Sequence, residues 1–217
     1  MIVTIDGPAG AGKSSAARRL AERLGFRFLD TGAMYRAVAL AALRRGHDWN
    51  NVEALARLVF VLDIEVDENH VRLDGEDVTE AIRTSEVTAI TRYAADNPGV
   101  REHLVQLQRE AAEGRDVVTE GRDQGTVVFP DAECKIFLTA SPEERARRRM
   151  QDLLARGEPA RFEEVLSQQN QRDQRDSRRD CGPLVMAADA VEVITDRLSP
   201  EEVVDRLEKI VRERMKV

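Results

Sequence analysis

A glycine-rich segment near the start of the chain carries the residues best suited to chemistry. It reads Gly7-Pro-Ala-Gly-Ala-Gly12-Lys13-Ser14 and fits the pattern G-x-x-x-x-G-K-[ST] at every fixed position. In such a loop, backbone N–H groups surround phosphate oxygens, the lysine reaches the β- and γ-phosphates, and the hydroxyl can bind Mg²⁺. We therefore expect Mg²⁺ at Ser14 and ATP phosphates at Gly7, Pro8, Ala9, Gly10, Ala11, Gly12, Lys13, Ser14 and Ser15.

A second group of charged residues follows helical spacing later in the chain. Arg172, Arg175, Asp176 and Arg179 stand at i, i+3, i+4 and i+7, so they should share one face of a helix predicted over 162–180. On its own, such a face is typical of a solvated, salt-bridged helix. Beside a phosphate loop it favours phosphoryl transfer, because arginine forks suit phosphate oxygens.

Two loops should bring further charged residues to the same place. They span 30–36 and 120–123 and follow predicted strands, and ligands of open α/β sheets bind beyond the carboxyl ends of strands. We expect Arg36 and the Arg122-Asp123 pair to lie near the phosphate loop. The phosphate loop alone does not distinguish a kinase from a GTPase, an ATPase or a nucleotide-gated regulator. The additional charged residues are what favour a kinase.

The elements that position these residues alternate between strand and helix, which favours a parallel sheet covered by helices on both faces. Stretches with the apolar, β-branched composition of buried strands occur at 2–5, 26–29, 117–119, 135–138 and 191–195. We predict helices over 15–24 and 97–114, and capping boxes at Ser141 and Ser199. The fold class is α/β, with a five-stranded parallel sheet of the phosphate-loop type.

Two interruptions break this alternation. Residues 62–78 alternate apolar and polar side chains around turns at 67–69 and at Asp74-Gly75, which predicts an antiparallel β insert. Gly157 and Pro159 separate two charged helices and indicate a short lid over 151–163. We expect one domain over 1–217 that contains the insert and the lid.

Composition limits the partners and the compartment. The chain has 217 residues, 42% of them hydrophobic, and its 33 basic and 40 acidic residues give a net charge of −7, which argues against nucleic-acid binding. No apolar run approaches a membrane span, no signal peptide is visible, and Cys134 and Cys181 belong to no metal or disulfide motif. We expect a soluble, cytoplasmic monomer with small-molecule substrates.

The chain closely resembles the bacterial cytidylate kinase family over essentially its whole length. The resemblance rests on Thr4 to Ser14, Leu29 to Arg36, Asp74 to Val78 with Ile82-Arg-Thr84, Gly121-Arg-Asp123 with Gly125 to Asp131, and Arg172 to Arg179. It implies ATP-dependent phosphorylation of CMP or dCMP, a core of the adenylate kinase type, and a monophosphate-binding region over about 32–95.

The resemblance also implies which residues hold the acceptor. Arg101 and Asp123 would bind the cytosine, and Arg172 with Asp176 would bind the sugar. The ribose-phosphate region or α-phosphate would be held by Thr31, Arg36, Arg122 and Arg179, and the catalytic residues would be Lys13, Arg122 and Arg179. The arginines of 145–149 would open the lid, one of them near ATP. Arg92 stands where the family usually has Ser, and Gln124 where it has an apolar residue.

The mechanism needs no side-chain base, because the acceptor phosphate has a second pKa near 6 and is largely a dianion at neutral pH. Two alternatives remain open. One is a kinase for another acceptor, such as UMP, AMP or a small metabolite. The other is a nucleotide-gated binding protein that hydrolyses ATP slowly and signals through a partner.

Overall fold

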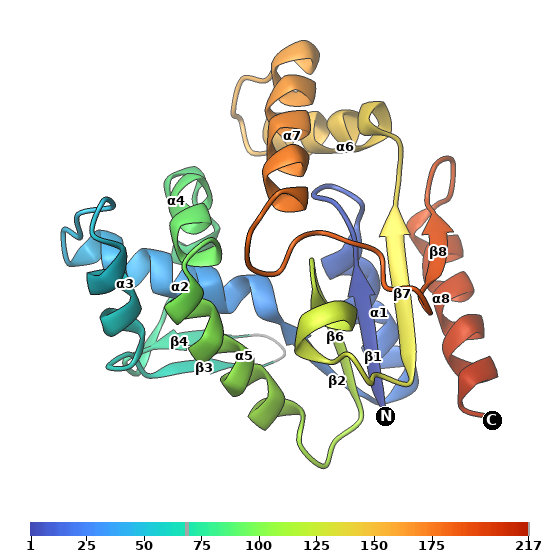
Figure 1. The fold of residues 1–217 in the computed structure, drawn as a ribbon. Coiled ribbons are helices and arrows are strands. Elements are labelled where there is room, and N and C mark those ends of the chain that lie inside the picture. Colours follow the sequence, from blue (N-terminus) through green and yellow to red (C-terminus); the bar gives the residue numbers. More distant parts are fainter. Residues whose placement is uncertain (68–69, 217) are drawn as a thin grey trace.

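A five-stranded parallel sheet forms the centre of the computed structural model, which describes residues 1–67 and 70–216 (Figure 1). The strand order is β2-β6-β1-β7-β8, and all four neighbouring pairs are parallel. The strands are β1 (Ile2–Asp6), β2 (Arg27–Asp30), β6 (Val117–Gly121), β7 (Cys134–Thr139) and β8 (Val191–Ile194). All five strands predicted from the sequence are therefore present, within one or two residues at each end.

Helices cover both faces of this sheet, as the alternation of elements predicts. Val3, Ile5 and Val118 point to one face and share a core with α1 (Lys13–Leu24) and α8 (Pro200–Arg214). Ile2 and Val117 point to the other face and pack with α5 (Pro98–Ala112) and the π-helical turn Gln124–Val128. Successive residues of a strand face opposite sides, so a strand buried on both faces is apolar throughout.

A second core lies beside the sheet, around α2 (Thr31–Arg44). Ten residues of α2 are buried, including the run Ala37–Ala42, because α3, α4 and the insert pack around it. The insert is a three-stranded antiparallel sheet in the order β3-β4-β5, as predicted, although the predicted turn at 67–69 lies partly outside the described residues. These elements are α3 (Val52–Val59), β3 (Ile64–Val66), β4 (Val71–Leu73), β5 (Glu76–Asp77), the short 3₁₀ helix Ala81–Arg83 and α4 (Ser85–Ala95).

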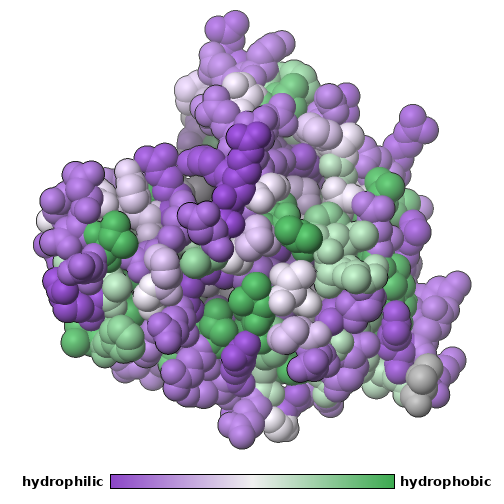
Figure 2. All heavy atoms as spheres, viewed as in Figure 1, coloured by the Kyte–Doolittle hydropathy of each residue, from purple (hydrophilic) through white to green (hydrophobic). Residues whose placement is uncertain are grey.

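Two helices, α6 (Pro142–Ala155) and α7 (Phe162–Ser177), stand beyond the carboxyl edge of the sheet (Figure 1). The turn between them contains Gly157, and Glu158 in that turn accepts a hydrogen bond from Ser85 of α4 at 3.0 Å. Figure 2 shows that this upper part of the molecule is covered mostly by hydrophilic residues. Among the described residues, no helix is both long and apolar enough to cross a membrane.

Two local predictions need correction. Ser199 forms the complete capping box with Glu202, but at Ser141 only the first half forms, because the Ser141 N–H is held by Asp196. The helix predicted over 162–180 ends at Ser177, so Arg179 lies in the following segment and not on the helix face. Beyond this end the chain turns back, and the Leu184 N–H donates to the Asp176 carbonyl at 2.8 Å.

Candidate active site

The phosphate loop joins β1 to α1 at the carboxyl edge of the sheet, as predicted. Of the predicted phosphate-binding residues, 7–12 form the loop between β1 and α1, and 13–15 begin α1. Lys13 lies under the loop, where its Nζ donates to the Pro8 carbonyl at 2.9 Å. Burial lowers the pKa of Lys13 to about 7, and the charges of Arg122 and Arg172 act in the same direction.

Two side chains from α6 and α7 hold the tip of this loop. Arg145 Nη1 and Gln169 Nε2 each donate to the Ala9 carbonyl, at 3.0 Å in both cases. Gly10 lies between them with φ +80°, and a Cβ there would be 3.0 Å from Gln169 Nε2. A larger residue at Gly10 would therefore push the loop away from both supports.

Ser14 and Glu120 bring two oxygen groups together beside the loop. The Ser14 hydroxyl donates to Glu120 Oε1 at 2.6 Å, and Glu120 is buried at the end of β6. Thr31, the first residue of α2, donates through Oγ1 to the Glu120 carbonyl at 2.7 Å. Hydroxyl and carboxylate oxygens are the ligands that Mg²⁺ prefers, and Mg²⁺ commonly uses one or two carboxylates together with substrate phosphates.

Positive charge gathers between the phosphate loop and α7. Arg122 Nε donates to Asp176 Oδ2 at 2.9 Å, and Arg179 lies 2.7 Å from both Asp176 Oδ1 and Asp96 Oδ1. Burial alone would raise the pKa of Asp176, but Arg122, Arg179 and Arg172 together hold that pKa below its usual range. One carboxylate thus orients two of the predicted phosphate-binding arginines.

Arg36 and Arg172 complete an arginine cluster with Arg122 and Arg179. Within the described part of the chain, Arg36 and Arg172 form no ion pair. Burial lowers the pKa of Arg36, and it lowers that of Arg172 to about 10, with the charge of Arg122 as the next contribution. Lys13 likewise lies within ion-pair distance of no described carboxylate. Carboxylates act on all three only from beyond ion-pair distance, with Glu120 and Asp176 among them. Three cations in one place, none with a direct carboxylate partner among the described residues, favour a site for an anionic ligand.

Arg101 and Asp123 form a second polar centre, beside Tyr35 of α2. The Arg101 guanidinium bonds the Asp123 carboxylate, and both side chains are at most 7% exposed. Arg101 also lies over the ring of Tyr35, with its guanidinium carbon 5.7 Å from the ring centre. Burial raises the pKa of Asp123, although Arg101 and Arg179 oppose the increase.

Arg179 also lines a hollow of about 880 Å³ that opens between α4 and the end of α7. Figure 2 shows this face hollowed in that region. Arg92 lies at the hollow, where its guanidinium contacts the ring and the hydroxyl of Tyr93. Arg175, which the helical spacing placed with the phosphate-binding arginines, is instead exposed and donates to the Gln171 carbonyl.

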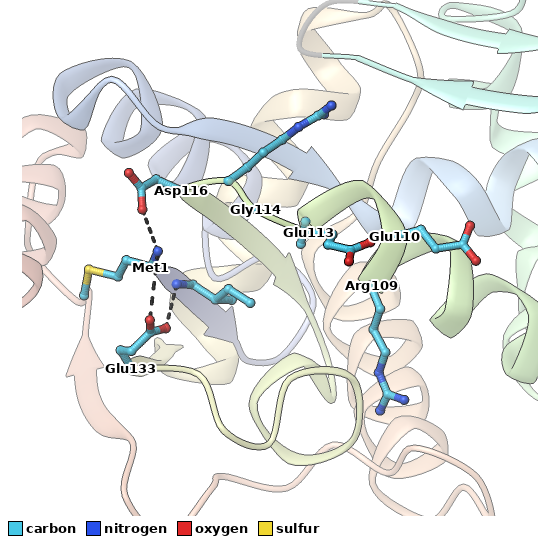
Figure 3. Close-up of a pocket in the computed structure, with 10 residues that line it drawn as sticks. Met1, Arg109, Glu110, Glu113, Gly114, Asp116 and Glu133 are labelled. Atoms are coloured by element: carbon cyan, nitrogen blue, oxygen red, sulfur yellow. Dashed lines mark hydrogen bonds and ion pairs between the residues drawn. The ribbon is translucent and has the colours of Figure 1, made fainter.

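A smaller hollow of about 550 Å³ lies at the opposite, amino-terminal edge of the sheet (Figure 3). There the amino group of Met1 lies between the carboxylates of Asp116 and Glu133, at 2.5 and 3.9 Å. No residue of the phosphate loop lines it. Ligands of open α/β sheets bind at the carboxyl edge, so this second hollow is separate from the candidate site.

The site also uses residues that the sequence analysis did not predict. Glu120 lies inside the predicted loop 120–123 but was given no role there, and Gln169 precedes Arg172 by one helical turn, so position alone could have suggested both. Arg145 is one of the four arginines of 145–149 expected to open the lid, and the structure shows it holding the phosphate loop. Asp96 carries no motif and is found only through its contact with Arg179.

Solved structures share this architecture at low sequence identity. A shikimate kinase from Bacteroides thetaiotaomicron superposes with a TM-score of 0.52 at 18% identity, covering 98% of each chain. A gluconokinase from Sinorhizobium meliloti gives a TM-score of 0.51 at 16% identity, covering 99% of this chain and 93% of the other. At this level of identity the likeness shows the fold alone.

Sequence comparisons are more specific. A cytidylate kinase from Rhodopirellula baltica is 54% identical over 213 residues, which cover 98% of this chain and 93% of the relative. One from Pelotomaculum thermopropionicum is 52% identical, with coverage of 93% and 92%. The family model described as cytidylate kinase matches residues 3–213. With the phosphate loop and the arginine cluster in place, this match shows that the chain belongs to the cytidylate kinase family.

Proposed function

We propose that the chain transfers the γ-phosphoryl group of ATP to CMP or dCMP, giving ADP and CDP or dCDP. The observation that carries this proposal is the group of three unpaired cations, Lys13, Arg36 and Arg172, beside a phosphate loop. An ATP-dependent phosphotransferase has to neutralise phosphate charge on both substrates, and these cations are available for that purpose.

ATP would occupy the phosphate loop, with Lys13 at the β- and γ-phosphates and backbone N–H groups of residues 7–15 around the phosphate oxygens. The contact between Ser14 and Glu120 supports a Mg²⁺ site at these two oxygens. Mg²⁺ bound there would neutralise charge on the triphosphate. Among the described residues no cluster of three or more His, Cys, Asp or Glu side chains is placed to hold a metal, which fits an ion held jointly with ATP.

The acceptor would lie between α2, α7 and the loop after β6. Its phosphate and ribose-phosphate region would be held by Arg36, Arg122 and Arg179, with Thr31 at the start of α2; the ion pairs of Arg122 and Arg179 with Asp176 support this assignment. Arg172 would bind the sugar together with Asp176, whose carboxylate also holds Arg122 and Arg179. Arg101 and Asp123 present N–H donors and carboxylate acceptors that match the edge of a cytosine ring.

Catalysis would consist of positioning and charge stabilisation. The acceptor phosphate is largely a dianion at neutral pH, because its second pKa is about 6, so it can attack without a general base. Lys13, Arg122 and Arg179 would stabilise the charge on the transferred group. Closure of the α6–α7 hairpin would exclude the water that otherwise hydrolyses ATP, and the Ser85–Glu158 contact supports such closure.

The test is ATP-dependent turnover with CMP, dCMP, UMP and AMP at matched concentrations. We expect CMP or dCMP to give the highest kcat/KM, and a preference for UMP or AMP would contradict the assignment. ADP release without an acceptor, unchanged by CMP, would favour the nucleotide-gated alternative. Arg172→Ala should raise the acceptor KM, whereas Arg175→Ala, an exposed arginine one turn away on the same helix, should leave it unchanged.

A further inference from the structure

The segment that follows α7 passes directly over the Arg101–Asp123 pair. Gly182 is buried in this segment and adopts φ +62°, a conformation that L side chains rarely adopt. A Cβ built on Gly182 would overlap both the Arg101 guanidinium and the Asp123 carboxylate. Only glycine allows the backbone to lie this close to the pair.

The same segment is tied to the phosphate-binding arginines. The Leu184 N–H donates to the Asp176 carbonyl at 2.8 Å, while the Asp176 carboxylate orients Arg122 and Arg179. Pro183 lies between Gly182 and Leu184 and restricts the backbone further. The segment 181–184 is therefore held at both the phosphate side and the base side of the proposed acceptor site.

We propose that Gly182 is a positioning residue for recognition of the acceptor base, because its missing side chain lets segment 181–184 close over Arg101 and Asp123 and fix their orientation. The inference rests on the proposed function, in which this pair binds the base. Donors and acceptors discriminate between bases only while their geometry is fixed and water is excluded from them. The backbone of Gly182 covers the Arg101–Asp123 pair, which fixes its geometry and excludes water from it without any side chain.

The test compares Gly182→Ala with Gly46→Ala. Gly46 has nearly the same backbone angle, φ +63°, but nothing lies within 4 Å of a Cβ built there. Gly46→Ala therefore carries the same cost of placing alanine at positive φ, without any steric overlap. Displacing binding groups by about 1 Å can cost about a hundredfold. We expect Gly182→Ala to raise the KM for CMP by roughly ten- to a hundredfold and to lower the kcat/KM preference for CMP over UMP.

The KM for ATP should stay within about twofold of the wild-type value in both variants, because a Cβ at Gly182 does not contact the phosphate loop. Gly46→Ala should leave the KM for CMP, the KM for ATP and the preference for CMP over UMP unchanged. A lower thermal midpoint in Gly182→Ala without a rise in the CMP KM would overturn the positioning role. Failure of the proposed function would be seen differently, as the absence of CMP turnover in the wild-type enzyme.

A second variant covers the case in which Gly182→Ala does not fold. Pro183→Gly keeps glycine at 182 and loosens the segment, because it removes the fixed φ of proline. We expect it to raise the CMP KM by roughly three- to tenfold, with the ATP KM unchanged, since the pair would be held less firmly. An unchanged CMP KM in this variant would overturn the inference.

Discussion

At pH 8, binding of ATP should be accompanied by uptake of roughly one proton, because the phosphates restore the charge of Lys13. In the free protein, burial lowers the pKa of Lys13 to about 7 from 10.5, and Arg122 and Arg172 add repulsion. At one pH unit above this pKa, only about a tenth of the molecules carry the charge. Phosphate oxygens in contact with Nζ favour the ammonium form, so the proton comes from the buffer.

The same shift predicts how stability changes with pH in the absence of nucleotide. Between pH 7 and 10.5 the unfolded chain holds a proton on Lys13 that the folded chain has lost. Stability rises with pH wherever the unfolded state binds more protons, so the contribution of Lys13 increases through this window. Saturating ATP should remove the increase, because the bound state keeps the proton.

The measurement is titration calorimetry of ATP with Mg²⁺ at pH 8 in two buffers of different ionisation enthalpy, from which the number of protons follows. Lys13→Arg is the matched control, because a guanidinium remains charged at this pH and has no proton to gain. At pH 6, where Lys13 is already protonated, its contribution should vanish. Zero uptake by the wild-type protein at pH 8, or equal uptake by Lys13→Arg, would refute the reasoning.

Three further changes test other parts of the molecule. Arg179→Ala should lower turnover by more than about tenfold with the fold intact, since its role is charge stabilisation; near-normal turnover would count against it. Glu120→Gln should raise the Mg²⁺ concentration for half-maximal activity by about ten- to a hundredfold, measured at fixed ATP, and an unchanged requirement would place the metal elsewhere. Ser199→Ala should cost about 1 kcal/mol in denaturant unfolding with kinetics unchanged, because it removes one capping box.

The strands and the phosphate loop could be predicted because their signals are local. A buried parallel strand is a short apolar run, and the loop is defined by residues adjacent in sequence. The prediction that α7 continues to 180 was wrong, because the chain turns back after Ser177 and the Leu184 N–H contacts the Asp176 carbonyl. Helical spacing alone cannot register such a contact. It also placed Arg175 in the site, although Arg175 is an exposed residue within α7.

The supports of the phosphate loop could not be predicted for a related reason. Arg145 and Gln169 contact Ala9 across 136 and 160 residues, and both bond a backbone carbonyl that carries no sequence signature. Their side chains meet only after α6 and α7 have packed together beyond the sheet. The roles of the predicted residues in binding ATP and the acceptor remain predictions to be tested by the substitutions above.

The unpaired cations also have a consequence for the lifetime of the protein in a cell. Arg172 repels both Lys13 and Arg36 until phosphates arrive, and only the native state brings these cations together around a nucleotide. A ligand at a hundred times its Kd stabilises its protein by about 2.7 kcal/mol. Loss of nucleotide would remove this stabilisation, and we expect limited proteolysis of the protein to be faster without ATP than with it.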